Sequence, residues 1–347
     1  MVEPSPLAPL HVWLINPLDG EVHDAIERLR RAPDVEHVAV MPDVHLAGDV
    51  CIGVAIGTTH LIYPQAVGGD IGCGVLAVPF DVRADRLAEP AIAGRVLAKL
   101  AGAVPARRWN RKMTMEPPHD VASDTLSDPR LDAAWRKHGV LELATLGSGN
   151  HFAELQVDGE DRLWLMVHSG SRAMGPAIRD FHLERAEGAG SSGLRALDAN
   201  SLQGRAYLPD VTWARRYAAA NRRQIAMNIG AILASTVGAT LQWDLAITTD
   251  HNHVESEPHG GGTFFLGASQ RGYGGGSRAV GRPARLDGCR KLSRAGTRLP
   301  SGSVLECARR GPADESDCSP PQYQHTRTAA ANGRHLVRLP PCRAAPR

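Results

Sequence analysis

Apolar positions along the chain recur with both helical and strand periods. Residues 21–31 place Val22, Ala25, Ile26 and Leu29 on one face at helical spacing, which predicts an amphipathic helix. The same reasoning predicts further helices over residues 91–100, 174–189 and 213–237, and strands over residues 11–15, 35–41, 163–167 and 245–248. Because helices and strands follow one another in mixed order with turn-rich connections, we expect an α+β fold in which helices flank mixed β-sheets.

Two intervals break this pattern. Residues 106–131 are rich in proline, methionine and charge, and we expect a surface loop there. Residues 267–347 carry neither period. Because the chemically distinctive motifs lie between residues 41 and 255, we interpret residues 1–266 as one domain and residues 267–347 as a disordered or poorly packed tail.

The segment A-V-G-G-D-I-G-C-G (66–74) carries the first candidate residues for chemistry. It places Asp70 and Cys73 three residues apart on a glycine-rich bend, immediately before the apolar run 75–80. Glycine allows the backbone to approach a ligand closely, and a carboxylate with a thiolate can form part of a metal site. A buried, inert cysteine would give the same short pattern. A metal site at this bend is therefore supported only if other motifs point to it.

Three histidine motifs accompany the bend: G-S-G-N-H-F (147–152), V-H-S-G-S-R (167–172) and D-H-N-H-V-E (250–255). His168 follows one predicted strand directly, and His251 lies close to the end of another. Side chains at strand ends are held by a rigid element, which suits metal ligands. Each histidine alone is more typical of a hydrogen-bonded loop residue than of a metal ligand. Together with Asp70 and Cys73 they predict a metal centre with room for two ions.

These motifs, together with M-P-D-V-H (41–45), resemble the RtcB-type RNA-splicing ligases in order and spacing over residues 10–260. Members of that family join an RNA 3′-phosphate or 2′,3′-cyclic phosphate to an RNA 5′-hydroxyl, using GTP and manganese. A histidine becomes guanylylated and transfers GMP to the RNA 3′-phosphate, and the 5′-hydroxyl then displaces the GMP. The resemblance therefore implies a mixed-sheet RNA ligase of the tRNA-splicing or RNA-repair class, with GTP, manganese and RNA ends as its ligands.

The resemblance also implies roles for individual residues. The positions that match the family's ligands for two manganese ions, with the thiolate shared between the ions, are Asp70, Cys73, His151, His168 and His251. Asn150 and Asn252 match positions that contact GTP. Arg172 matches a position that holds RNA phosphate, which suits a bidentate guanidinium. Asp43 and His45 belong to a family motif near the site.

The guanylylated histidine of the family has no counterpart in this chain. The family motifs H-R-K-G-A, P-G-S-M-G and H-G-A-G-R, the last of which carries that histidine, are absent, so we assign no catalytic residue. Two other functions therefore stay open for the chain as written. One is a non-catalytic remnant that binds metal, GTP or RNA. The other is a metal-dependent phosphoesterase, which a two-metal site would also serve.

Composition changes abruptly where the missing motifs would begin. Residues 261–347 contain 14 arginines but one lysine, and four of the six cysteines. GC-rich DNA read in a shifted frame yields arginine, glycine, proline and alanine. With one G deleted, a back-translation of residues 266–275 reads L-V-H-R-K-G-A-T-A, and the same frame yields S-S-A-H-G-A-G-R-R-M-S from residues 305–316. We infer a one-nucleotide frameshift near codons 266–267, with the codon of the missing histidine spanning Ala308 and Arg309.

Charge and cysteine content limit the class of protein. Residues 1–260 carry 24 Lys and Arg against 32 Asp and Glu, a net charge of −8, whereas residues 261–347 carry 15 against 5, a net charge of +10. The domain is therefore not a generally basic nucleic-acid-binding surface, and RNA must be bound by a local patch and the metals. Residues 1–260 contain only Cys51 and Cys73 and no signal peptide or membrane span, so we expect a cytoplasmic protein.

We expect the chain as written to form no covalent adduct with labelled GTP and manganese, because covalent catalysis needs a nucleophile placed beside the phosphate that it attacks. Removal of one G near codon 267 should restore a labelled protein band on a denaturing gel, and with it the joining of a 3′-phosphate RNA to a 5′-hydroxyl RNA. A band from the unrepaired chain that disappears on replacing His325 or His335 would contradict the first expectation. An inactive repaired chain would overturn the frameshift.

Overall fold

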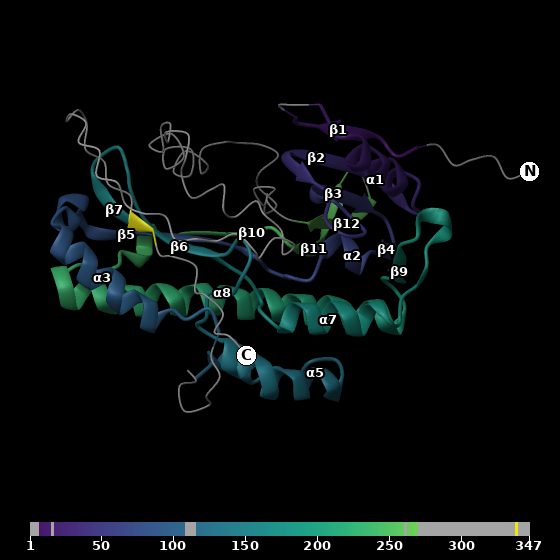
Figure 1. The fold of residues 1–347 in the computed structure, drawn as a ribbon. Helices are drawn as coiled ribbons and strands as arrows, with labels where there is room; N and C mark the ends of the chain where they lie inside the picture. Colours follow the sequence, from purple (N-terminus) through teal and green to yellow (C-terminus); the bar gives the residue numbers. More distant parts are fainter. Residues whose placement is uncertain (1–6, 15–16, 108–115, 260–261, 270–336, 339–347) are drawn as a thin grey trace, which may run out of the picture.

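The computed structural model describes residues 7–14, 17–107, 116–259, 262–269 and 337–338 of the chain. Within these ranges the fold is α+β, as the sequence predicts, with helices packed against mixed and antiparallel β-sheets (Figure 1). The tail inferred over residues 267–347 lies almost wholly outside the described residues, so its packing stays a prediction.

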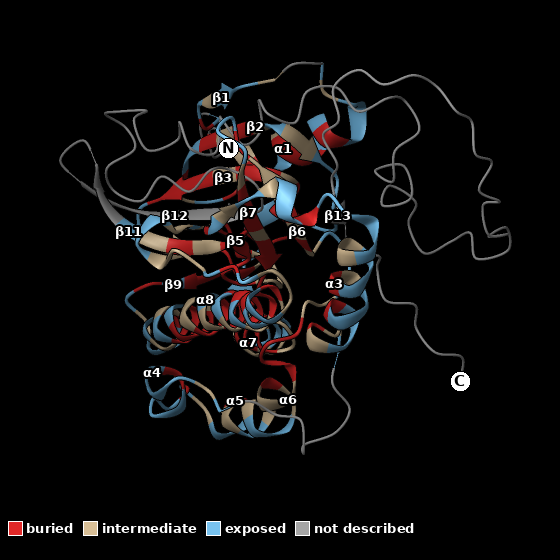
Figure 2. Cartoon of the chain, turned by 90° about the vertical axis from the view of Figure 1, so that its left-hand side faces the viewer, coloured by how far each residue is buried: buried red, intermediate tan, exposed pale blue. Residues whose placement is uncertain are grey.

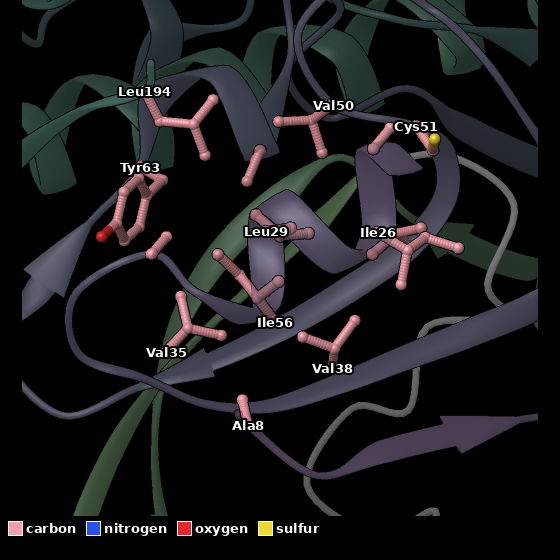
Figure 3. Packing of buried hydrophobic residues seen from close by; sticks show 14 of the residues in the cluster. Ala8, Ile26, Leu29, Val35, Val38, Val50, Cys51, Ile56, Tyr63 and Leu194 are labelled. Carbon is pink, nitrogen blue, oxygen red and sulfur yellow. The ribbon is translucent and has the colours of Figure 1, made fainter. Parts of the chain in front are cut away.

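The first sheet has the strand order β1-β2-β3-β12-β11. These strands are β1 (Leu10–Val12), β2 (Val35–His45), β3 (Ile52–Thr58), β11 (His253–His259) and β12 (Gly262–Ser269). β1 runs parallel to β2, and the remaining pairs are antiparallel. Helix α1 (Gly20–Arg30) connects β1 to β2, and its apolar stripe, including Ile26 and Leu29, packs on Val38 and Ile56 of the sheet (Figure 3).

The second sheet has the order β10-β5-β7-β6-β13 and is antiparallel throughout. Its strands are β5 (Gly74–Arg83), β6 (Phe152–Val157), β7 (Arg162–Ser169), β10 (Ile247–Asp250) and β13 (Val337–Arg338). Alternate side chains of β5 and β7 are buried against α3 (Pro90–Ala103) and α8 (Leu202–Val237). A third, small sheet joins β4 (Leu61–Ile62), β9 (Arg195–Asp198) and β8 (Glu187–Gly188).

Helix α8 is 36 residues long and runs beneath the sheets, between them and α5 (Pro129–Ala134) (Figures 1 and 2). It packs against α3, α4 (His119–Ala122), α7 (Met174–Leu183), β5, β7, β9 and β11. The side chain of Ser201 accepts a hydrogen bond from the N–H of Gly204 and caps its start, and Gly238, with φ of +72°, ends it. No helix in the described part of the chain is long and apolar enough to cross a membrane.

Several predicted boundaries were wrong, each because tertiary contacts overrode a local signal. The helix predicted over residues 213–237 begins at Leu202 and continues through Pro209, since buried Tyr207 and Val211 anchor its first turns. The helix predicted over 174–189 ends at Leu183, because Glu187–Gly188 pairs with β9. The strand predicted over 35–41 extends to His45 with a register shift after Val40.

The prediction that residues 106–131 form a surface loop was incomplete. The interval contains α4 and the start of α5, and Val121, Leu126 and Leu131 are buried. The side chain of Asp128 caps α5 by accepting a hydrogen bond from the N–H of Arg130. The single apolar residues in this polar stretch were too widely spaced to show a period, although they pack into the core around α7 and α8.

A buried polar network joins α7 and α8 to the loop before α5. The carboxylate of Asp210, 1% exposed, lies 2.7 Å from Nε2 of His182 and accepts hydrogen bonds from the N–H and the hydroxyl of Ser127 at 2.9 and 2.5 Å. Burial of such a group is stable only while its partners are present. The network therefore fixes α7 on α8 and orders the loop around Ser127.

Substitution of Asp210→Asn should lower the free energy of unfolding by about 2–3 kcal/mol, because it removes a buried charged acceptor and leaves His182 and Ser127 with an imperfect partner. Urea denaturation followed by circular dichroism measures the change. The exposed Asp244 provides the control, and Asp244→Asn should change stability by less than about 0.5 kcal/mol. Equal stability of the two variants would contradict the proposed role of the network.

Candidate metal centre

The bend singled out in the sequence lies between α2 (Pro64–Val67) and β5. The N–H of Cys73 donates to the carbonyl of Asp70 at 2.9 Å and closes the turn. Gly72 has φ of +69°, and a Cβ at this position would lie 2.8 Å from the Cα of Arg215 in α8. The turn therefore requires glycine at position 72, both for its left-handed backbone and for close packing on α8.

Strand register brings the histidine motifs to this bend. β5 pairs with β7 on one side and β10 on the other, so that Gly74 lies opposite both Ser169 and Asp250. Cys73, which precedes Gly74, consequently lies between His168 and His251, and the N–H of His251 donates to the Cys73 carbonyl at 2.9 Å. Three ligand candidates far apart in sequence thus become neighbours through backbone pairing alone.

His151 joins the group from the start of β6, because Phe152 pairs with His168. Two sets of donor atoms result. One set is Asp70, Cys73 and His151, and the other is Cys73, His168 and His251. Within each set all donor atoms lie within 4.8 Å of one another. The Cys73 thiol belongs to both sets. Two ligands bound to one ion at about 2.0–2.3 Å each can be up to about 4.6 Å apart, so this spacing suits a metal ion in each set.

The hydrogen bonds of two imidazoles leave Nε2 facing the cluster. Nδ1–H of His151 donates to the carbonyl of Leu146 at 2.9 Å, and Nδ1–H of His168 donates to the carbonyl of Asn150 at 3.1 Å. Nε2 of His151 then lies 2.7 Å from the Asp70 carboxylate, and because both are acceptors, a proton or a metal ion must lie between them. Backbone carbonyls that orient histidines in this way are typical of metal sites.

Burial and neighbouring charges shift the pKa values of Cys73 and Asp70 in opposite directions. Burial raises the pKa of the Cys73 thiol, as does the neighbouring Asp70 charge, so the thiol stays protonated in the absence of metal. Burial also acts to raise the pKa of Asp70, but the hydrogen bond and charge of His151 and the charge of Arg172 outweigh it, and the pKa of this carboxyl is lowered. Metal binding by Cys73 would therefore release a proton. One carboxylate, one thiol and three imidazoles fit a divalent transition metal.

Arg172, the predicted phosphate ligand, lies beside this cluster. Its guanidinium nitrogen is 3.4 Å from Nδ1 of His151. A Cβ at Gly147 would lie 2.0 Å from the same guanidinium, so the position of Arg172 depends on that glycine. The guanidinium thus lies near the ligand candidates, on the side of His151.

The other predicted site residues take different positions. The exposed Asn150 contributes its carbonyl to His168, while the buried amide of Asn252 donates to the carbonyl of Asp70 at 3.1 Å. Asp43 and His45 lie on β2, with Nδ1 of His45 bonded to the Asp43 carbonyl at 2.8 Å, and neither belongs to the two ligand sets. Asn252 therefore supports the turn that carries Asp70 and Cys73 directly, whereas Asp43 and His45 bond to each other on β2.

A cavity of about 350 Å³ adjoins the cluster and is lined by Asp70 and Asn252. Its other walls come from residues 47–50 and Ile52, from Gln65 of α2 with the two glycines that follow this helix, and from α7. Arg179 of α7 reaches into the space that a side chain at Gly69 would fill, since a Cβ there would lie 2.6 Å from its guanidinium. The cavity is large enough for part of a nucleotide and connects to the predicted ligands.

Two buried polar residues of α8, Asn221 and Arg222, are 0% and 2% exposed and were not among the predicted site residues. Asn221 bonds to Ser169 at the end of β7, and Arg222 bonds to Ser169 and to Gly72, next to the ligand candidates His168 and Cys73. The signal available was the polar pair N-R within the run A-A-A-N-R-R-Q-I-A-M, in which apolar residues flank the polar ones. Polar positions on a helix usually face solvent, so the sequence pattern alone gives no reason to expect this pair in the core.

Substitution of Cys73→Ser should abolish tight binding of manganese at both sites, because the two ligand sets share this thiol. The matched control is Cys51→Ser, since Cys51 is also buried and free but lies in the packing cluster around α1. Equilibrium dialysis and metal analysis should give two ions for the Cys51 variant and a loss of bound metal for the Cys73 variant. Equal metal content would show that Cys73 is not a ligand.

Comparison with known proteins agrees with this geometry. The family tRNA-splicing ligase RtcB matches residues 25–267 of the chain. RNA-splicing ligase RtcB of Escherichia coli K12 is 29% identical over 292 residues, covering 75% of this chain and 70% of that protein. tRNA-splicing ligase RtcB of Methanococcus maripaludis is 26% identical over 305 residues, covering 71% and 63% respectively. Since the family match spans well over half of the sequence and includes every residue of the cluster, the chain belongs to the RtcB family of tRNA-splicing ligases.

Proposed function

We propose that this chain contains the metal-binding core of a GTP- and manganese-dependent RNA ligase. Its substrates would be RNA with a 3′-phosphate or 2′,3′-cyclic phosphate and RNA with a 5′-hydroxyl. The observation that carries the proposal is the pair of ligand sets sharing Cys73, beside the guanidinium of Arg172. A metal cluster next to an arginine forms a local positive site for phosphate on a domain whose overall charge is negative.

Asp70, Cys73 and His151 would hold one ion, and Cys73, His168 and His251 the other. When bound, divalent metal ions stabilise negative charge on phosphate oxygens and orient the reacting groups. The carbonyls of Leu146 and Asn150 hold two imidazoles in the required orientation. Ligand positions that are fixed before binding reduce the entropy lost when metal and substrate bind.

Arg172 would bind the terminal phosphate of the RNA, because a guanidinium donates two parallel hydrogen bonds to phosphate oxygens. Exposed Asn150 would contact GTP on the same side, from the loop that precedes His151. Asn252 was also expected to contact GTP, and its bond to the Asp70 carbonyl favours instead a role in shaping the turn. Free thiols at Cys51 and Cys73 are compatible with the cytoplasmic location that we propose.

We further propose that the chain as written binds these ligands but does not ligate RNA. The motif H-G-A-G-R, which carries the guanylylated histidine in the family, is absent from it. The family match ends at residue 267, the position at which the frameshift was inferred from codons. A binding remnant is therefore the second candidate function for this polypeptide, whereas the intact gene product would be the ligase.

Gly147→Ala should weaken binding of a 3′-phosphate oligoribonucleotide to the manganese-loaded chain by about tenfold, because the new methyl group displaces the Arg172 guanidinium. The matched control is Gly149→Ala. Gly149 also has a positive φ, +79° against +98°, but has no atom within 4 Å of its Cβ position. Fluorescence anisotropy with 3′-phosphate and 3′-hydroxyl oligonucleotides measures the effect. Equal affinity of both variants for the phosphorylated RNA would contradict the role of Arg172.

A further inference from the structure

A cationic side chain lies directly beneath the candidate metal centre. Arg222 of α8 is 2% exposed, and one of its terminal nitrogens donates to the carbonyl of Gly72 at 2.7 Å and to that of Ser169 at 2.9 Å. Gly72 immediately precedes Cys73, and Ser169 immediately follows His168. A single nitrogen of Arg222 thus bridges the turn that carries Cys73 and the end of strand β7 that carries His168.

Burial of the Arg222 guanidinium costs free energy that packing alone does not offset. Burial lowers the pKa of Arg222, while the charges of Asp250, Cys73 and Asp70 act in the opposite direction. Among the described residues Arg222 forms no ion pair with a carboxylate, and its Nε has no hydrogen-bond partner. A buried charge without a close counter-charge is less stabilising than an apolar side chain of similar volume. The role of Arg222 is therefore to hold the two carbonyl groups to which it donates hydrogen bonds.

Other side chains of α8 bind the neighbouring turns. The amide of Asn221 donates to the carbonyl of Thr145 and to the hydroxyl of Ser169 at 3.1 and 3.0 Å. Arg215 pairs with Asp250, the residue before His251, at 2.7 Å. Side chains of helix α8 therefore bond to the residues next to Cys73, His168 and His251, and Arg222 bonds to two of these three segments.

We propose that Arg222 is a positioning residue of the metal centre. By holding the carbonyls of Gly72 and Ser169 to one nitrogen, it fixes the separation of Cys73 from His168, whose Sγ and Nε2 are 3.2 Å apart. That separation allows one thiolate to serve both ligand sets. The inference rests on the proposed function only in requiring that the cluster binds divalent metal.

Cobalt(II) titration of the full chain tests this, because cobalt replaces manganese or zinc at such sites and gives a thiolate charge-transfer band. The wild-type chain should bind two ions and show the band. Arg222→Met should weaken cobalt binding by about tenfold or more and reduce the band for each bound ion, as is usual when a residue that orients ligands is lost. Arg222→Lys should lie between them, since an ammonium on a shorter side chain can still donate to the carbonyls.

The matched control is Asp210→Asn, which removes a buried charge from the same helix at a residue whose partners are His182 and Ser127 rather than a ligand segment. It should lower stability and leave the cobalt affinity and band unchanged. If Arg222→Met does not fold, the decisive comparison is Arg222→Lys with Asp210→Asn. Weaker cobalt binding by the lysine variant supports the proposal, and equal binding overturns it.

The outcomes separate this inference from the proposed function. Wild-type affinity and spectrum in Arg222→Met would overturn the positioning role alone. The same loss in Asp210→Asn as in Arg222→Met would also overturn it, because the effect would then follow general destabilisation of α8. Absence of cobalt binding by the wild-type chain would overturn the metal centre, and with it both proposals.

Discussion

Backbone pairing of β5 with β7 and β10 is the constraint on which the rest of the site depends. It sets Gly74 opposite Ser169 and Asp250, and this register alone places Cys73 between two histidines. A shift of one residue in either pair would turn the neighbouring side chains to the opposite face. The apolar faces of β5 and β7, buried against α3 and α8, hold the register, so the chemistry of the cluster depends on packing some distance from it.

The second constraint is electrostatic. The cluster brings a carboxylate, a thiol and three imidazoles close together, and the guanidinium groups of Arg172 and Arg222 lie beside it. Groups of this kind are stable when buried only if each has a partner. The carbonyls of Leu146 and Asn150 supply partners to the outer nitrogens of two imidazoles, which leaves the inner donors to share protons or metal ions.

The sequence was sufficient for the α+β class and for the neighbourhood of the five ligand candidates, because glycine-rich bends and strand ends are visible as local patterns. Geometry now places those five residues together, although their roles as ligands stay predictions. Helix boundaries were predicted wrongly where they depend on contacts with residues far away in the sequence. The early start of α8 depends on Tyr207 and Val211 meeting other elements, and the interval 106–131 is partly helical because of isolated buried residues. Arg222 was missed since its partners are carbonyl groups, which no sequence pattern reveals.

The register of β5 and β10 also has a consequence for the order of folding. Gly74 and Asp250 are 176 positions apart, so their pairing closes a very long loop, whereas α8 forms from contacts within one turn of helix. The helix and the β5–β7 pair can form first, and β10 completes the cluster by bringing in His251. Metal ions would then bind after most of the fold has formed. They would slow the unfolding of β10 rather than direct the folding of the chain.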